Sequence, residues 1–165
     1  MAKDLTDVIN GRMRKRETRL VLGKAFRHRP IYFTGVIKPI WDDELGKHGD
    51  YRFEVVHPRN IDVDHTATEN DARKMSWIAH HYELTIKEVL MRWPDKEEEL
   101  YAELKIEADK EPSEQKLASK IKISEIWFEW YEKEDDKWSK LYGVAWRYKD
   151  VVFDKIKNPY YDWEG

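Results

Sequence analysis

The sequence predicts an α+β protein, in which an N-terminal helix, small antiparallel β units and a capped helical segment are followed by a β-meander. Three observations support this prediction. A basic N-terminal stretch has helical spacing, a Thr-x-x-Glu box precedes an apolar run at Thr85, and alternating aromatic strands with charged turns fill the end of the chain. With 165 residues, the chain is long enough for one domain or two small ones.

Composition excludes several classes of protein. The 30 Lys and Arg residues nearly balance 33 Asp and Glu residues, so the net charge of −3 lacks the overall basic excess of a nucleic-acid-binding module. There is no cysteine, which excludes a disulfide framework and thiolate-bound zinc. No stretch approaches the ~18 apolar residues of a membrane helix, and the first residues contain no apolar run of signal-peptide length. We therefore expect a soluble chain with no membrane partner.

The first predicted helix covers residues 5–26. Basic residues are concentrated at positions 12–29, where Glu17 is the only acid. Charge runs of this kind are most often solvated helix faces, and the alternative is a contact with another subunit or with DNA. The candidate contact residues are Arg12, Arg14, Lys15, Arg16 and Arg19.

Two β segments and a further strand are expected next. Residues 31–40 are rich in β-branched and aromatic types, and Gly35 inside this run indicates a bulge or a close backbone approach. Turn glycines at Gly46 and Gly49 allow the chain to reverse into a hairpin partner at residues 51–56. After a turn at residues 57–62, alternation at residues 73–84 predicts another strand.

The clearest helix start is at Thr85, whose side chain is placed to form a capping box with Glu88. Leu84 and Val89 have the spacing of a hydrophobic staple, and Pro94 should end this helix near Trp93. A second helix is expected at once, with Asp95 as its cap, Glu98 completing another box, and an apolar stripe of Leu100, Leu104 and Ile106. Residues 111–120 read as a polar linker.

The last section predicts a meander with strands at residues 122–131, 137–147 and 151–156. In the first of these strands, Ile126, Phe128 and Trp130 share one wholly apolar face, and the other face is mixed. Such rings usually pack in a core, and the alternative is a surface for a neighbouring subunit or a ligand. The candidate packing or assembly aromatics are Trp127, Phe128, Trp130, Trp138 and Trp146.

Residue patterns for catalysis or metal binding are weak. Residues 62–71 place acids at alternate positions as a calcium loop does, but the central glycine and the terminal glutamate are missing. His80 and His81 are adjacent, so in a strand they face opposite sides. The sequence has no phosphate loop, dinucleotide fingerprint or nucleophile elbow. We therefore expect a protein that is not an enzyme and uses no metal or cofactor. The alternative is an enzyme site built from carboxylates of distant segments, which no local sequence pattern reveals.

The order of the segments resembles the middle of a tailed-bacteriophage portal protein. The resemblance starts near residue 20 and consists of a β unit at residues 33–56, the turn PRNIDVD at 58–64, and a strand and helix that end in a W-P stop at 71–94. After an acidic linker come an E-x-W strand at 125–127, strands at 138–146 and 151–153, and an N-P-Y segment at 158–160. Each motif is weak by itself, and the likeness lies in their order and spacing.

The resemblance implies a structural role. Portal subunits form a homo-oligomeric ring of about twelve copies at one capsid vertex, through which double-stranded DNA passes without sequence recognition. The partners implied are the terminase motor and capsid or neck proteins, and the location is the virion after synthesis in the bacterial host cytoplasm. Residues 1–84 then correspond to an N-terminal helix with a wing-like β unit, 85–120 to a stem-like segment, and 121–165 to a clip-like meander. Portal chains are much longer, so we expect a fragment or a reduced relative; the alternative is a small nucleic-acid-binding module that uses the basic helix 12–29.

Overall fold

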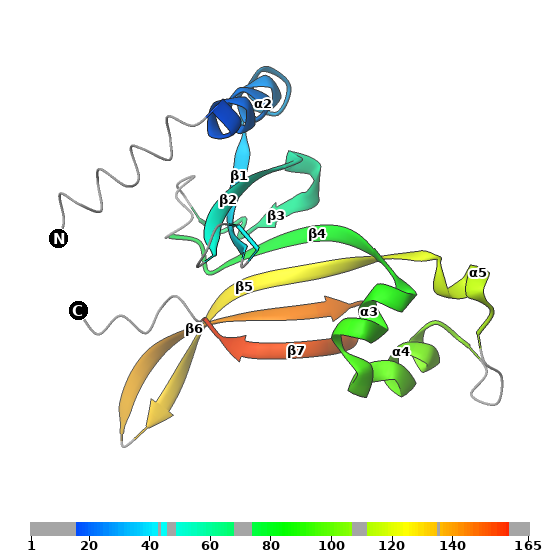
Figure 1. Cartoon of the computed structure of the whole chain (residues 1–165). Helices are drawn as coiled ribbons and strands as arrows, with labels where there is room; N and C mark the ends of the chain where they lie inside the picture. Colours follow the sequence, from blue (N-terminus) through cyan, green and yellow to red (C-terminus); the bar gives the residue numbers. More distant parts are fainter. Residues whose placement is uncertain are drawn as a thin grey trace. The chain divides into compact units, whose positions relative to one another are not determined.

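The computed structural model describes residues 16–42, 44–45, 49–67, 74–106, 112–134 and 136–158, and confirms the α+β class. The chain divides into two compact units, residues 1–61 and residues 62–165. The first holds helix α2 and the two-stranded sheet β1-β2, and the second is built on a five-stranded sheet in the order β3-β4-β5-β6-β7 (Figure 1). This division differs from the three regions expected from sequence, because β4 joins the same sheet as the meander.

Helix α2 (Arg16–Tyr32) ends later than expected, while residues 1–15 of the predicted helix lie outside the described part. The predicted strand at 31–40 was therefore wrong at its start, since Ile31 and Tyr32 are helical. Pro30 lies inside the last turn, where it removes one N–H donor. The turn is still closed by a hydrogen bond, because the Phe33 N–H donates to the Arg29 carbonyl at 2.8 Å. The Tyr32 ring also packs against His57, with 5.0 Å between the ring centroids.

The hairpin of β1 (Val36–Asp42) and β2 (Asp50–Val56) pairs antiparallel from Val36 opposite Val56 to Asp42 opposite Asp50, as predicted. Gly35 stands just before β1, where an added Cβ would lie 2.4 Å from the Ala25 carbonyl oxygen of α2. The close backbone approach expected at this glycine is thereby confirmed. Among the described residues of this unit, Ala25 and Val56 are the buried apolar ones.

A short 3₁₀ helix, η1 (Pro58–Asn60), follows the hairpin where a turn was expected. Its cap is His57, whose Nδ1 accepts the Arg59 N–H at 3.2 Å. The next three residues form strand β3 (Ile61–Val63), which the sequence reading assigned partly to the turn. Three residues are too few to show a period, so this strand carries no sequence signal of its own.

Strand β4 (Trp77–Thr85) leads directly into α3 (Ile86–Arg92), and the predicted capping box is present. Thr85 Oγ1 accepts the Glu88 N–H at 3.2 Å, while the Glu88 carboxylate accepts the Thr85 N–H at 2.7 Å. That hydrogen bond from the Thr85 backbone lowers the pKa of Glu88. The helix ends at Arg92, with Trp93 as its C-cap, one residue before Pro94.

Replacement of the cap, Thr85→Ala, should destabilise the second unit by about 1 kcal/mol, because one amide of the first turn loses its acceptor. Amide exchange at Lys87 and Glu88 measures the effect where it arises. Glu88→Gln is the control, since glutamine also completes a capping box and should change protection less. Equal protection in Thr85→Ala and the unchanged chain would contradict the role of this box.

The second predicted box, at Asp95 and Glu98, was wrong. Asp95 lies in the 3₁₀ turn η3 (Pro94–Lys96), and α4 (Glu97–Glu103) begins after Lys96 without a side-chain cap. Pro94 is the reason, because its fixed φ starts a tight turn in which the Lys96 N–H donates to the Trp93 carbonyl. In the expected linker, Ser113 caps another short helix, α5 (Glu114–Leu117).

The predicted meander is present as β5 (Lys120–Glu134), β6 (Lys137–Tyr148) and β7 (Val151–Lys157), paired antiparallel. Helices α3 and α4 cover one face of this sheet (Figure 1). The core lies on that face, and its buried members are Ile86, Val89, Leu100, Ile121, Ile123, Val151 and Phe153.

The wholly apolar face of β5 is therefore not the one that the helices cover. Ile126, Phe128 and Trp130 are only half-buried, whereas Ile123, on the face that looked mixed, is fully buried. The capped helix α3 follows β4 on the side of Ile123, and its Ile86 and Val89 complete the core there. The side on which a helix packs depends on the path of the chain after β4, which the alternation within β5 does not reveal.

Candidate functional site

The most distinctive feature of the second unit is a two-stranded arm, formed by residues 130–134 of β5 and 137–141 of β6. Pairing of β4 with β5 ends at Trp77 opposite Phe128, and pairing of β7 with β6 ends at Gly143 opposite Lys157. Beyond these points β5 and β6 pair only with each other among the described strands, from Trp130 opposite Leu141 outward. The hairpin consequently extends past the rest of its sheet (Figure 1).

This arm exposes aromatic side chains. Trp138 is 69% exposed and Tyr131 is 60% exposed. Their partners in the register are Lys133 and Lys140, so the two rings lie on one face as diagonal neighbours. An isolated two-stranded ribbon is at best marginally stable in water, and exposed aromatic rings are typical of contact surfaces. The arm is therefore the best-marked candidate for an interface.

The other predicted aromatics have different surroundings. Trp146 borders the core, with its ring 6.3 Å from that of Trp93, which in turn stacks on Phe153 at 4.9 Å. The Trp127 indole donates to the Glu125 carboxylate at 2.7 Å. Of the five rings named from sequence, Trp138 is exposed and the other four are half-buried.

Phe128 and Trp130 lie on the sheet face opposite the one that the described helices α3 and α4 cover. Their ring centroids lie 5.4 Å apart, and the Lys155 ammonium stands over both rings, 5.4 Å and 4.9 Å from the two centroids. Trp130 also fills the space beside Gly143, where an added Cβ would lie 2.7 Å from the ring. These contacts contribute to the half-burial of both rings.

The five basic residues proposed as a contact are only partly described. Arg12, Arg14 and Lys15 lie outside the described residues, and Arg16 begins α2. Arg19 is exposed on this helix, as are three more basic residues further along it, namely Lys24, Arg27 and Arg29. These basic residues are thus solvent-exposed in the part of the helix that the structure describes.

A hollow of about 310 Å³ lies beside α2 in the first unit. Its walls come from the second half of the helix and from the start of β1, and include Phe26, Arg29, Phe33 and Ile37. Phe26 is 64% exposed and Phe33 is 90% exposed, so the rim is apolar and accessible. Phe33 also has a φ of 57°, a strained value for a bulky residue, and such strain tends to persist at functional positions.

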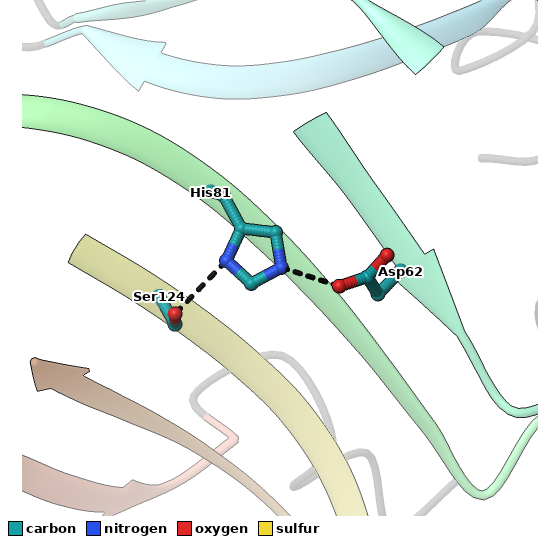
Figure 2. Close-up of polar contacts among 3 residues, drawn as sticks. All are labelled: Asp62, His81 and Ser124. Carbon is teal, nitrogen blue, oxygen red and sulfur yellow. Dashed lines mark hydrogen bonds and ion pairs between the residues drawn. The ribbon is translucent and has the colours of Figure 1, made fainter. Parts of the chain in front are cut away.

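Three polar residues from three strands meet in the second unit, as Figure 2 shows. His81 of β4 contacts the Ser124 hydroxyl through Nδ1 at 2.9 Å and the Asp62 carboxylate through Nε2 at 2.8 Å. His81 is largely covered, while the Asp62 side chain is 62% exposed on β3. Sequence reading missed this group, because 19 and 43 residues separate His81 from its two partners and no local spacing connects them.

A serine, a histidine and an aspartate that are hydrogen-bonded in series are also the components of a catalytic nucleophilic triad. Such a site needs free N–H donors for the oxyanion, about 3 Å from the reacting atom. Ser124 lies inside β5, opposite His81 of β4 and Arg147 of β6, so the neighbouring N–H groups belong to the sheet ladders. The arrangement supports a polar bridge that fastens the edge strand β3 to β4 and β5.

Asp64, in the stretch that resembles the start of a calcium loop, closes a loop with its side chain. One carboxylate oxygen accepts the Thr66 N–H at 2.8 Å and the Thr66 hydroxyl at 2.6 Å, and the other accepts the Ser76 N–H at 3.1 Å. The hydrogen bonds from Thr66, followed by that from Ser76, lower the pKa of this buried carboxyl to about 2. Asp62 and Asp64 are thus both engaged by the protein itself, and residues 68–71 of this stretch lie outside the described part.

Acid should weaken the second unit through Asp64. Because the folded pKa of about 2 lies below the unfolded value near 3.8, the stabilisation is complete above pH 4 and disappears as the pH falls toward 2. Denaturant midpoints between pH 5 and pH 2 measure this loss. Asp64→Asn should have a lower midpoint at pH 5, and the difference from the unchanged chain should shrink toward pH 2; a constant difference would contradict the assignment.

Within the described residues, no group of three or more His, Cys, Asp or Glu side chains is placed to hold a metal ion. None of the described helices is long and apolar enough to cross a membrane. No protein-family model and no curated protein matches the chain.

Proposed function

We propose that this chain is the middle part of a portal subunit of a tailed bacteriophage, one copy in a ring that forms a conduit for DNA. The observation that carries the proposal is the arm with its exposed Trp138 and Tyr131. Exposed aromatic rings on a projecting ribbon are typical of a contact surface, and a ring subunit needs surfaces that its neighbours cover. The function is accordingly structural, with no covalent chemistry.

The order of the elements supports the same proposal. The PRNIDVD turn falls on η1 and β3, and the next strand runs without a break into the capped helix α3, which ends before Pro94. The E-x-W motif lies in β5, and β6 and β7 follow as the remaining strands. The described residues of these segments follow one another in the order of the portal-like pattern as far as residue 158, and this order supports the proposal.

Charge also fits a conduit through which DNA slides. The acids Asp95, Glu97, Glu98 and Glu99 are all exposed around the start of α4, and the whole chain has a net charge of −3. Phosphates are repelled by such a surface, so DNA of any sequence would pass without being held. The exposed basic residues of α2 would then serve contacts between subunits, where complementary charge fixes the register.

Native mass spectrometry over a range of concentrations tests the proposal. We expect cyclic assemblies whose copy number stays fixed once they close, up to about twelve subunits. Replacement of both arm rings, Trp138→Ser with Tyr131→Ser, should shift the population toward monomer. Met91→Ser is the matched control, because Met91 is 76% exposed but lies on α3, away from the arm. A chain that stays monomeric at every concentration, or that forms only a two-fold dimer, would contradict the ring.

A second candidate function is nucleic-acid binding through α2, which the exposed Arg19, Lys24, Arg27 and Arg29 favour. Titration with duplexes of unrelated sequence at low and moderate salt separates the two functions. For a conduit we expect weak binding that moderate salt abolishes and that does not depend on sequence. Micromolar or tighter binding at moderate salt, or a preference of more than about tenfold between sequences, would favour the binding module.

A further inference from the structure

We propose that the arm of one copy docks into the hollow beside α2 of a second copy, with Trp138 as the anchor. This inference rests on the proposed assembly into a ring and names the two surfaces that meet. A ring requires a contact between two different patches of the same chain, because a patch that binds its own copy closes a dimer instead. The arm and the hollow are two such patches, one projecting and one concave.

The hollow suits an aromatic guest. Phe26, Phe33, Leu22 and Ile37 give it apolar walls, and Arg29 stands among them as its one charged lining residue. Its volume of about 310 Å³ lies at the lower end of the range for ligand pockets. An indole ring that enters can pack on the apolar walls and against the face of the guanidinium, an interaction for which tryptophan is the best aromatic partner.

The arm exposes such an aromatic side chain, Trp138, and cannot bury it by itself. Trp138 and Tyr131 lie on one face, and the two lysines opposite them are already bonded to acids. Lys133 contacts Asp136 at 2.6 Å, and Lys140 contacts Glu129. The hydrogen bond that the Lys140 ammonium donates to the Glu129 carboxylate also raises the pKa of Lys140. Both lysines are therefore paired with acids, and because the Lys140 ammonium also lies 5.9 Å from the Tyr131 ring centroid, Trp138 is the more accessible ring of this face.

Net charge favours the pairing over arm-to-arm contact. The arm, counted with its turn as residues 130–141, contains four acids and three lysines and has a net charge of −1, whereas α2 contains five basic residues and one acid and has a net charge of +4. Two arms repel each other, and so do two copies of α2, while an arm and α2 attract. The second copy of this chain therefore supplies both the apolar hollow and the complementary charge that the arm lacks.

Disulfide trapping between two differently tagged copies tests this contact, since the chain contains no cysteine of its own. One copy carries Lys133→Cys, directly opposite Trp138 on the arm, and the other carries Thr34→Cys in the hollow. In the control, the first copy carries Lys87→Cys instead of Lys133→Cys, because Lys87 is an exposed lysine on α3. Under mild oxidation we expect about tenfold more crosslinked heterodimer from the arm pair than from the control pair, the ratio that a preference of about 1.4 kcal/mol gives.

Addition of Trp138→Ser to the first copy, or of Phe26→Ser to the second, should return the yield to the control level. Both side chains are more than half exposed, so neither change should prevent folding. Equal yields from the arm and control pairs, or a yield that survives both serine variants, would overturn the proposal. The native mass of the unchanged chain distinguishes the two proposals. A closed ring without the selective crosslink refutes this contact alone. The crosslink without a ring refutes the portal function alone.

Discussion

Ile123→Ala should destabilise the second unit by about 2–5 kcal/mol, the usual cost of removing a large aliphatic side chain from a packed core. Ile123 is fully buried and belongs to the cluster that joins β5 to α3 and α4. The change would leave a cavity beneath both helices, which pack against the sheet through Ile86, Val89 and Leu100. Denaturant unfolding followed by the fluorescence of the tryptophans near this core measures the loss.

Ile126→Ala is the matched control for this experiment. It removes the same atoms from the same strand, but from the opposite face, where Ile126 is only half-buried. We expect a clearly smaller loss, because less apolar surface returns to water and no covering helix is left over a cavity. A larger loss from Ile126→Ala than from Ile123→Ala would place the core on the face of Phe128 and Trp130 and contradict the observed arrangement of the helices.

The parts of the fold that the sequence predicts correctly depend on local interactions. The capping box at Thr85 joins residues three positions apart, and the meander follows from alternation and charged turns, which neighbouring residues decide. The close approach at Gly35 was likewise indicated by a single glycine in a β-rich run. Such features can be predicted because their physical cause lies within one turn of helix or one hairpin.

The corrections arise where distant contacts or a nearby proline decide the outcome. Residues 31–32 are rich in β-favouring side chains, yet they stay helical, since Tyr32 packs against His28 and His57. Asp95 has the spacing of a cap, but Pro94 places it in a 3₁₀ turn. The buried face of β5 was decided by where α3 and α4 pack, which no alternation within the strand reports.

In the candidate site, too, local features could be predicted from the sequence, whereas contacts between distant segments could not. Trp138 was recognised from its residue type, but its exposure follows from the places where β4 and β7 stop pairing, and these lie in other strands. The hollow combines a helix and the first residues of β1, and the Asp62–His81–Ser124 bridge combines three strands. Residue type alone named Trp138 as a candidate, and only the topology brings together the residues of the hollow that we propose it enters.

Gly35→Ala should destabilise the first unit by about 1–3 kcal/mol, because overpacking at a point of close contact forces the backbone to shift. The new Cβ would stand 2.4 Å from the Ala25 carbonyl oxygen and 3.0 Å from its carbonyl carbon, and both belong to the backbone of α2. A flexible side chain could move aside, but a helix carbonyl cannot move without disturbing the turn around it. Amide exchange along α2 and β1 measures this change within the first unit alone.

Gly23→Ala provides the control, since it makes the same chemical change twelve residues earlier in the sequence. Gly23 is an exposed position of α2 where an added Cβ meets nothing within 4 Å. Alanine favours the helix over glycine, so this variant should gain about 0.5–1 kcal/mol and slow exchange in α2. The two substitutions are therefore expected to act in opposite directions on the same helix. If Gly35→Ala leaves exchange in α2 and β1 unchanged, the hairpin does not approach the helix at Ala25, and the hollow between Phe26, Phe33 and Ile37 that the arm would enter does not form as described.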